Sequence, residues 1–268
     1  MNNKLVSVVV PAYNREQYLE NTVKSVHSNT YRPIELIIID DGSADETYAI
    51  ANQLKDRLKS DDFEIKLMRQ PNQGAPSARN NGLENSTGKY LLFLDSDDEI
   101  PPAKLSSQIT MLEETGADVC VSDFTINYLQ GNTTESVYID NSRPLRKVAF
   151  HKSIGCSTAV MRAELAKSIT WCEELPNFQD MDYFLKVLLM SKKMVHLPES
   201  LYTYYRYSTG TISSNRSNKK VPYLKRIKSL FFDYNINFNY SSNLRHRVLG
   251  VFSLLYLVAL WGKYSLLR

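Results

Sequence analysis

The segment LLFLDSDDE, residues 91–99, begins with four apolar residues and continues with three closely spaced aspartates. Asp95, Asp97 and Asp98 would repel one another if all three were ionised and partly buried, so a positive partner should lie among them. Carboxylate oxygens suit Mg²⁺ or Mn²⁺, and such ions usually take few carboxylates together with phosphate oxygens. The spacing therefore predicts a divalent cation shared with a phosphorylated ligand, and a solvated turn is the alternative interpretation.

Polar residues also follow two other apolar runs. Residues 11–14 (PAYN) come after the run 5–10, and residues 40–43 (DDGS) come after the run 34–39. One carboxylate of the acidic pair would accept hydrogen bonds from a base or a ribose. The alternative is a turn in which Ser43 or Asp45 caps the next helix, because such residues favour helix starts.

The apolar residues alternate between strand-like and helix-like spacing. The predicted strands of the first half are residues 5–10, 34–39, 64–68, 90–94 and 118–122. They are short and apolar, as strands buried on both faces are, and helical spacing separates them. Asn14 followed by Gln17 resembles a capping box that starts the first helix. This order predicts an α/β fold with a mostly parallel central sheet, in which ligands bind at the carboxyl ends of the strands. The three polar clusters would then share one rim.

Beyond residue 123 the pattern is less regular. The expected elements are a hairpin or loop at 124–140, strands at 158–161 and 194–207, and helices at 181–190, 220–234 and 244–261. No linker rich in glycine, proline or serine divides the chain. We therefore expect one domain over residues 1–215 and a basic, helical C-terminal extension over residues 216–268.

Composition is ordinary for a soluble globular protein, with 43% hydrophobic and 23% charged residues. The three cysteines are widely spaced and odd in number, which argues against a disulfide framework and for a reducing, cytoplasmic compartment. The apolar run near the N-terminus is too short for a secretory signal. Residues 200–268 hold eleven Lys or Arg and one acid, a net charge of +10 against −7 for the rest of the chain. This asymmetry predicts an anionic partner for the C-terminal part.

The apolar stretch at residues 248–260 is 13 residues long. As a helix it would measure about 20 Å, which is shorter than the roughly 30 Å core of a bilayer. We therefore expect it to lie on an anionic membrane surface, at the inner face of the cell membrane, and not to span it. Packing on the core or in a homodimer interface is the alternative. Nucleic acid is not expected as a partner.

Two further segments carry candidate chemistry. Residues 72–82 form a loop that leads into a helix with Arg79. Asp180 and Asp182 stand at the start of the helix 181–190, and positions two apart on a helix differ by about 200°, so these carboxylates cannot both face one site. A carboxylate at a helix N-terminus stays ionised and suits a general base, although Asp180 could equally be an N-cap. The chain lacks the motifs of dinucleotide oxidoreductases, zinc peptidases and serine hydrolases.

Five stretches in order, VSVVVPAYN, IIIDDGSAD, NQGAPSARNNG, GKYLLFLDSDDE and FQDMDY, closely resemble the family 2 glycosyltransferases. The resemblance covers about residues 5–207 and implies the GT-A fold, a Rossmann-like sheet flanked by helices, with a nucleotide-binding half at 1–122 and an acceptor half at 123–215. It also implies inverting, metal-dependent transfer of a sugar from a UDP-sugar to a hydroxyl of a glycan or lipid-linked acceptor in surface polysaccharide synthesis.

The resemblance also assigns roles to residues. It places the uracil against Pro11, Tyr13 and Asp41. The full set that it implies for the nucleotide is Pro11, Tyr13, Asn14, Asp41, Arg79, Asp95, Ser96 and Arg206. It implies that Asp97, together with Asp95, binds Mn²⁺ or Mg²⁺ and that Asp180 is the catalytic base.

Two departures from the family pattern keep other functions open. Gln179 stands where the family usually has Glu, and Tyr207 stands where a histidine is common. A catalytically silent subunit that binds nucleotide sugars is therefore one alternative. A sugar nucleotidyltransferase is another, although such enzymes usually have a first loop rich in glycine and lysine, whereas this chain has PAYN. The sequence does not specify the sugar.

Overall fold

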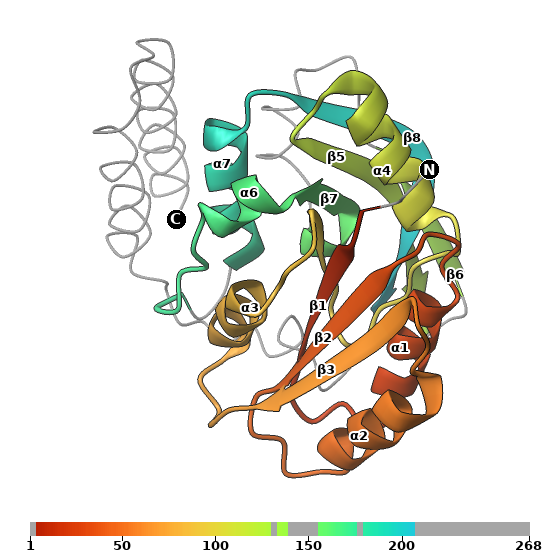
Figure 1. Cartoon of the computed structure of the whole chain (residues 1–268), viewed down its shortest axis with the longest axis vertical. Coiled ribbons are helices and arrows are strands. Elements are labelled where there is room, and N and C mark those ends of the chain that lie inside the picture. The colour runs from red at the N-terminus through yellow and green to blue at the C-terminus, as the bar shows by residue number, and fades with distance from the viewer. Residues whose placement is uncertain (1–3, 130–132, 139–154, 176–178, 207–268) are drawn as a thin grey trace.

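The computed structural model describes residues 4–129, 133–138, 155–175 and 179–206 (Figure 1). The helices expected at 220–234 and 244–261, and with them the extension 216–268, lie outside these residues. Within the described residues, no helix combines the length and the apolar character needed to cross a bilayer.

The strands of the described residues form one eight-stranded sheet in the order β3-β2-β1-β4-β7-β5-β6, with β8 paired to β5. They are β1 (Val6–Ala12), β2 (Ile34–Asp40), β3 (Phe63–Arg69), β4 (Tyr90–Phe93), β5 (Val119–Tyr128), β6 (Thr133–Val137), β7 (Ala159–Arg162) and β8 (Met194–Arg206). The first four strands run parallel, and β7 is antiparallel to both β4 and β5. The predicted α/β fold with a mostly parallel central sheet is confirmed.

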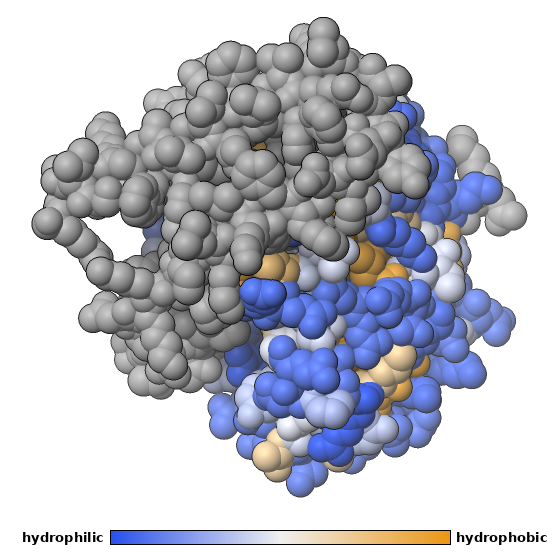
Figure 2. Space-filling model, turned by 90° about the vertical axis from the view of Figure 1, so that its left-hand side faces the viewer, coloured by the Kyte–Doolittle hydropathy of each residue, from blue (hydrophilic) through white to orange (hydrophobic). Residues whose placement is uncertain are grey.

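Helices cover both faces of this sheet (Figure 1). They are α1 (Leu19–His27), α2 (Thr47–Leu58), α3 (Ala75–Glu84), α4 (Lys104–Thr115), α6 (Ala163–Lys167) and α7 (Gln179–Met190). Helices α1, α2 and α4 pack on one face, and α3, α6 and α7 pack on the other. Figure 2 shows that the described surface seen from one side is mostly hydrophilic, with small hydrophobic patches.

The two-sided burial explains why the strands are apolar at every position. Val8 and Val10 of β1 belong to the core under α1, α2 and α4, whereas Val9 belongs to the core under α3, α6 and α7. All three side chains are fully buried. Because successive strand residues point to opposite faces, a strand between two helical layers must be apolar on both sides.

The strand register places the polar loops at one edge. Ala12 at the end of β1 lies opposite Asp40 at the end of β2, and Val9 lies opposite Phe93 at the end of β4. The chain leaves all three strands in the same direction because they are parallel. The segments after β1, β2 and β4 therefore share one rim, as the sequence predicts.

The start of the first helix differs from the prediction. Helix α1 begins at Leu19, and no side chain caps it. Asn14 has the left-handed backbone angle φ 51, and its Oδ1 accepts a hydrogen bond from the amide of Ala44. Asparagine tolerates this conformation better than most residues. The Asn14 side chain thus joins two loops of the rim instead of starting a helix.

Gly82 brings α3 close to the sheet. A Cβ atom at this position would lie 2.3 Å from Cγ1 of Val9, far inside normal contact distance. Only glycine permits this approach of the helix to β1. The position of α3 matters because the helix carries Arg79.

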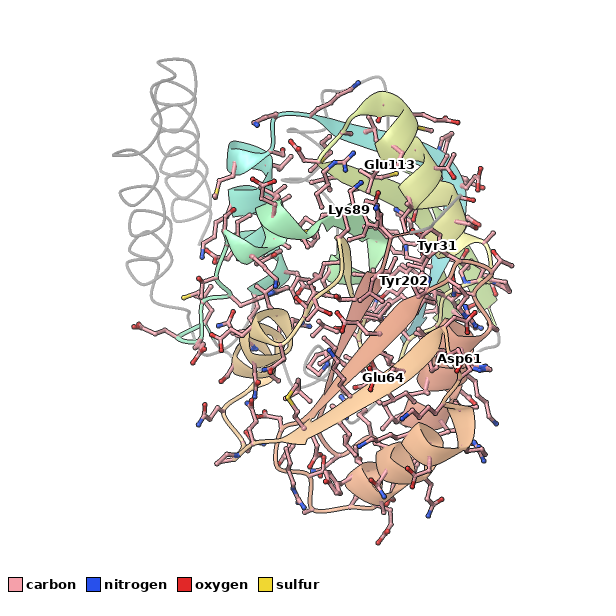
Figure 3. All side chains as sticks on the ribbon, in the orientation of Figure 1. Tyr31, Asp61, Glu64, Lys89, Glu113 and Tyr202 are labelled. Atoms are coloured by element: carbon pink, nitrogen blue, oxygen red, sulfur yellow. The ribbon has the colours of Figure 1, made fainter. Side chains whose placement is uncertain are left out.

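An ionic cluster fixes the opposite end of the sheet. Glu113 of α4 lies 3.2 Å from the ammonium of Lys89, just before β4, and 2.9 Å from the guanidinium of Arg162 in β7. Figure 3 labels Lys89 and Glu113 of this cluster. The cluster attaches α4 to the strand ends away from the polar rim.

Candidate active site

The loops after β1 and β2 are tied together. The amide of Asn14 donates to the Ser43 hydroxyl at 3.0 Å, and the amide of Asp41 donates to the Ala12 carbonyl at 2.8 Å. Pro11 is buried beneath this junction, whereas the Tyr13 side chain is 45% exposed. The ring of Tyr13 is therefore accessible to a planar ligand at the rim.

Asp41 is almost completely buried, with 2% exposure. Its Oδ1 accepts hydrogen bonds from Gln70 Nε2 at 2.8 Å and from the Gln73 amide at 2.9 Å, and its Oδ2 accepts one from the Gly74 amide at 2.8 Å. Each carboxylate oxygen can accept two hydrogen bonds, so Oδ2 keeps one acceptor position. Asp41 thus shapes the loop before α3, and its contact with uracil stays a prediction.

Gly42 permits the tight turn after Asp41. Its φ is 75, and a Cβ atom there would lie 2.9 Å from the amide nitrogen of Asn72. Both features exclude a side chain. The neighbouring Asp40 is fully buried, pairs with Arg69 at 3.0 Å and accepts a hydrogen bond from the Ser43 amide. Both carboxylate oxygens of Asp40 therefore bind groups of the protein itself.

Arg79 lies between two acids of the site. Its side chain is 6% exposed, and its Nη2 donates to Asp95 Oδ1 at 2.7 Å. Its Nη1 lies 3.9 Å from Asp180 Oδ1, and its guanidinium lies 4.5 Å from the ring centre of Trp171. Arg79 thus bridges the loop after β4 and helix α7. The role that the resemblance implies for Arg79, holding the nucleotide, stays a prediction.

A rigid aromatic group supports Arg79. The rings of Trp171 and Tyr183 are stacked with centres 4.1 Å apart. Asn80, the residue after Arg79, binds the backbone of Trp171 twice, because its Nδ2 donates to the carbonyl and its Oδ1 accepts from the amide. A cation over an aromatic face is favourable, more so where water is excluded. The guanidinium therefore has an aromatic support in addition to its two carboxylate partners.

The two acids of α7 face different surroundings, as the helical spacing predicts. Asp182 is fully buried and pairs with Lys186 at 2.9 Å. Asp180 keeps 41% side-chain exposure and points toward Arg79. Partial burial raises the pKa of Asp180, Arg79 opposes this rise, and Asp95 adds to it. Asp180 thus combines solvent access with an increased proton affinity, as a general base requires.

Asp97 is a carboxylate with a raised pKa. Burial and the nearby Asp95 raise its pKa to about 6, although Arg15 works in the opposite direction. Arg15 Nε lies 3.5 Å from Asp97 Oδ2. A carboxylate with a raised pKa beside a second carboxylate gains from an additional cation, because opposite charge favours the ionised form.

The third aspartate of the cluster serves the fold. Asp98 is fully buried and accepts hydrogen bonds from the Tyr202 hydroxyl and the Tyr205 amide. Tyr202, labelled in Figure 3, belongs to β8. The prediction that all three acids surround a cation is therefore wrong for Asp98, which holds β8 to the loop. Ser96, expected at the nucleotide, is 5% exposed and lies inside this loop.

A second group of possible metal ligands lies beside the first. One carboxylate oxygen each of Asp95 and Asp180 and the sulfur of Cys156 lie within 4.8 Å of one another. Burial, together with these two carboxylates, raises the pKa of the Cys156 thiol well above its usual range, so the sulfur stays protonated. The guanidinium of Arg79 already supplies one positive charge to this group. The oxygen donors of Asp95 and Asp97 fit Mn²⁺ or Mg²⁺ better.

Residues 7–169 match the sequence model of the family described as Glycosyl transferase family 2. The chain belongs to this family. It is 30% identical over 265 residues to an uncharacterized glycosyltransferase of Haemophilus influenzae, a match that covers 98% of this chain and 96% of that protein. It is 31% identical to the Escherichia coli UDP-Glc:alpha-D-GlcNAc-diphosphoundecaprenol beta-1,3-glucosyltransferase WfaP, covering 85% of this chain and 87% of that protein.

Solved structures share the GT-A fold with this glycosyltransferase. The structure of S. aureus TarS 1–349 in complex with UDP-GlcNAc superposes with a TM-score of 0.67 at 22% identity. The match covers 85% of this chain and 65% of that one, so the chain spans about two thirds of the TarS fragment. At this identity the likeness establishes the fold.

The described contacts of Arg206 are with Tyr128 and Leu129 and not with the other predicted site residues. Its guanidinium lies 5.7 Å from the ring centre of Tyr128, and its carbonyl accepts from the Leu129 amide. Both partners belong to β5 or follow it directly. A phosphate contact of Arg206 stays a prediction.

Sequence reasoning missed three residues of the site. Trp171 and Cys156 lie in segments without a recognisable motif or hydrophobic period. Arg15 has no sequence feature that separates it from arginines on the protein surface. Their roles depend on distances between segments far apart in the chain: Arg79 and Trp171 are 92 positions apart, and Asp95 and Cys156 are 61 apart. No local pattern encodes such pairs.

Proposed function

We propose that this glycosyltransferase inverts the anomeric configuration of a sugar as it moves it from a UDP-sugar to a hydroxyl of a lipid-linked saccharide in surface polysaccharide synthesis. The observation that carries this proposal is the proximity of Asp95 and Asp180, whose carboxylate oxygens lie within 4.8 Å of one another. In this proposal Asp95 helps to hold the donor and Asp180 is the base for the acceptor, so donor and acceptor bind next to each other. Such an arrangement places the reacting atoms side by side.

The rim supports a UDP-sugar as donor. Tyr13 offers an exposed ring at the edge of the sheet, and Asp41 Oδ2 has one free acceptor position for an N–H group such as that of uracil. The relatives WfaP and WfgD of Escherichia coli are named as enzymes that use UDP-Glc. The related TarS structure contains UDP-GlcNAc. We therefore propose that the nucleotide lies across the loops after β1, β2 and β4.

Asp180 acts as the general base in this proposal. Its carboxylate accepts the proton of the acceptor hydroxyl, whose oxygen forms a bond to the anomeric carbon from the face opposite the nucleotide. The bond between that carbon and the diphosphate oxygen breaks, and its electron pair leaves with UDP. The 41% exposure of the Asp180 side chain gives the acceptor access to the base.

Asp97 and Asp95 would hold a Mn²⁺ or Mg²⁺ ion. When bound, the ion would neutralise charge that develops on the leaving diphosphate. Arg79 orients Asp95 through their 2.7 Å hydrogen bond.

The names of the relatives and the charge of the chain support the proposed acceptor and its location. WfaP, WfgD and a Campylobacter jejuni relative are named for acceptors on diphosphoundecaprenol or PP-undecaprenol. Such acceptors reside in a membrane. We propose that the basic residues 216–268 bring the enzyme to the anionic inner face of that membrane. Flotation with vesicles containing 30% anionic lipid should then succeed at low salt and fail without anionic lipid.

The decisive assay offers the purified chain a GlcNAc-diphospholipid with UDP-Glc, UDP-Gal or UDP-GlcNAc and Mn²⁺. We expect one donor to give a lipid-linked disaccharide with the inverted, β configuration. A product that retains the configuration would contradict the mechanism. Binding of UDP with no transfer from any donor to any lipid-linked acceptor would favour the silent subunit.

A further inference from the structure

Arg15 is anchored on both sides and faces Asp97. Its amide donates to the Thr47 hydroxyl at 2.6 Å, and its carbonyl accepts from the amides of Tyr18 and Leu19. These contacts fix the backbone between the left-handed Asn14 and α1. The guanidinium then reaches the carboxylate, with 3.5 Å between Nε and Oδ2.

The contact is one that a competing cation can replace. The two side chains keep 18% and 16% exposure, so solvent reaches the pair. Arg15 Nη1 also donates to the carbonyls of Tyr13 and Asn14, which lie in its own loop. Arg79 differs, because it is 6% exposed and is held by Asp95 and Trp171 together. Arg15 is therefore the displaceable cation of the site among the described residues.

We propose that Arg15 neutralises Asp97 in the free enzyme, so that a divalent cation binds well only together with a nucleotide diphosphate. This inference rests on the proposed function. A cation that reaches Asp97 alone must push a like charge away from the carboxylate. A diphosphate brings negative charges that compensate both the ion and the displaced guanidinium.

The consequence is a positive coupling between the two ligands. Diphosphate raises the affinity for the cation, and by linkage the cation raises the affinity for the diphosphate by the same factor. The anchored backbone keeps Arg15 at the rim during the exchange, and its long side chain can turn from Asp97 to a phosphate oxygen. Without a positive charge at position 15, the cation alone binds better and the coupling decreases.

The test measures Mn²⁺ binding by the electron paramagnetic resonance signal of free Mn²⁺, with and without UDP. In Arg15→Gln we expect Mn²⁺ alone to bind about tenfold tighter, equal to ~1.4 kcal/mol, and the enhancement by UDP to fall by a similar factor. Arg15→Lys keeps the charge but replaces the planar guanidinium by a compact ammonium, so wild-type behaviour in this variant assigns the effect to charge. Arg57→Gln removes an exposed arginine that pairs with Glu20 on the surface, and it should bind Mn²⁺ as the wild type does.

Two results would overturn the inference. One is an unchanged or weaker affinity of Arg15→Gln for Mn²⁺ alone, and the other is an equal change in Arg57→Gln. If the wild-type chain binds Mn²⁺ and UDP but the coupling is the same in Arg15→Gln, only this inference fails. If the wild-type chain binds neither ligand, the proposed function fails and the inference fails with it.

Discussion

Arg79 donates a hydrogen bond to Asp95 across 2.7 Å while its guanidinium lies over the ring of Trp171. The same guanidinium lies 3.9 Å from Asp180. One buried cation thus links the loop that holds the donor in our proposal to the helix that carries the base. Removal of the Asp95 carboxylate would leave this buried cation with only the more distant Asp180 to compensate its charge.

Replacement of Arg79 by Gln should impair transfer most at low pH. Arg79 opposes the rise in the pKa of Asp180, so its loss raises that pKa further and protonates the base at a higher pH. We expect the acid limb of the kcat/KM profile to move to higher pH. We also expect a roughly tenfold to hundredfold loss of kcat at neutral pH, because Asp95 and the base lose their orientation. An acid limb at the wild-type pH would contradict the assigned role.

Gly82→Ala tests the close contact of α3 with β1. The added methyl group would lie 2.3 Å from Val9 Cγ1, so the helix must move or the strand must strain. We expect a loss of about 1–3 kcal/mol in the free energy of unfolding, measured with urea. Gly155→Ala is the matched control, because a Cβ atom there meets nothing within 4 Å and φ is −80. Equal stability of the two variants would argue against the tight packing.

Tyr202→Phe tests the structural role of Asp98. The substitution removes a hydroxyl that donates to a fully buried carboxyl group and leaves the ring in place. We expect a loss of about 1–3 kcal/mol in the free energy of unfolding. Tyr138→Phe changes a side chain that is 75% exposed and should be neutral. A Tyr202 variant as stable as the control would mean that Asp98 finds another partner.

Lys104 should make stability depend on pH. The lysine is fully buried, its Nζ has no hydrogen-bond partner among the described residues, and burial lowers its pKa to about 7 from 10.5. Between these pH values the unfolded chain binds a proton that the folded chain does not. The free energy of unfolding therefore rises with pH over this window, by at most ~1.4 kcal/mol per unit.

Lys104→Met removes this dependence. We expect the variant to be about 1–4 kcal/mol more stable than the wild type at pH 7 and to show a flatter pH profile. Lys55→Met, at an exposed position of α2, should keep the wild-type slope. The measurement is urea unfolding at pH 7, 8, 9 and 10. A slope in Lys104→Met equal to that of the wild type would assign the dependence to another group.

Strand and helix periods predicted the sheet because its strands lie between two helical layers. Residues 34–39 are apolar at nearly every position, and in the structure their side chains enter two separate cores. The predicted helix start at Asn14 is wrong, because the Asn14 side chain accepts a hydrogen bond from the amide of Ala44, which lies in a loop 30 residues away. A capping motif is a local signal, and this contact is not local.

The shared rim was predictable for a similar reason. Parallel strands end at the same edge, so the polar residues after β1, β2 and β4 had to meet. The different roles of the three aspartates after β4 were not predictable from their spacing. Asp95 and Asp98 differ in role because Arg79 and Tyr202 lie beside them, and these partners are 16 and 104 positions away in the chain.

The transfer rate of Asp180→Asn tests the central claim most directly. The amide has nearly the same shape as the carboxylate but cannot accept the proton of the acceptor, so we expect kcat to fall by about 10²–10⁴ while UDP binds with unchanged affinity. Asp61→Asn, at an exposed site before β3, should transfer at the wild-type rate. Near-normal turnover of Asp180→Asn would contradict the assignment of Asp180 as the base.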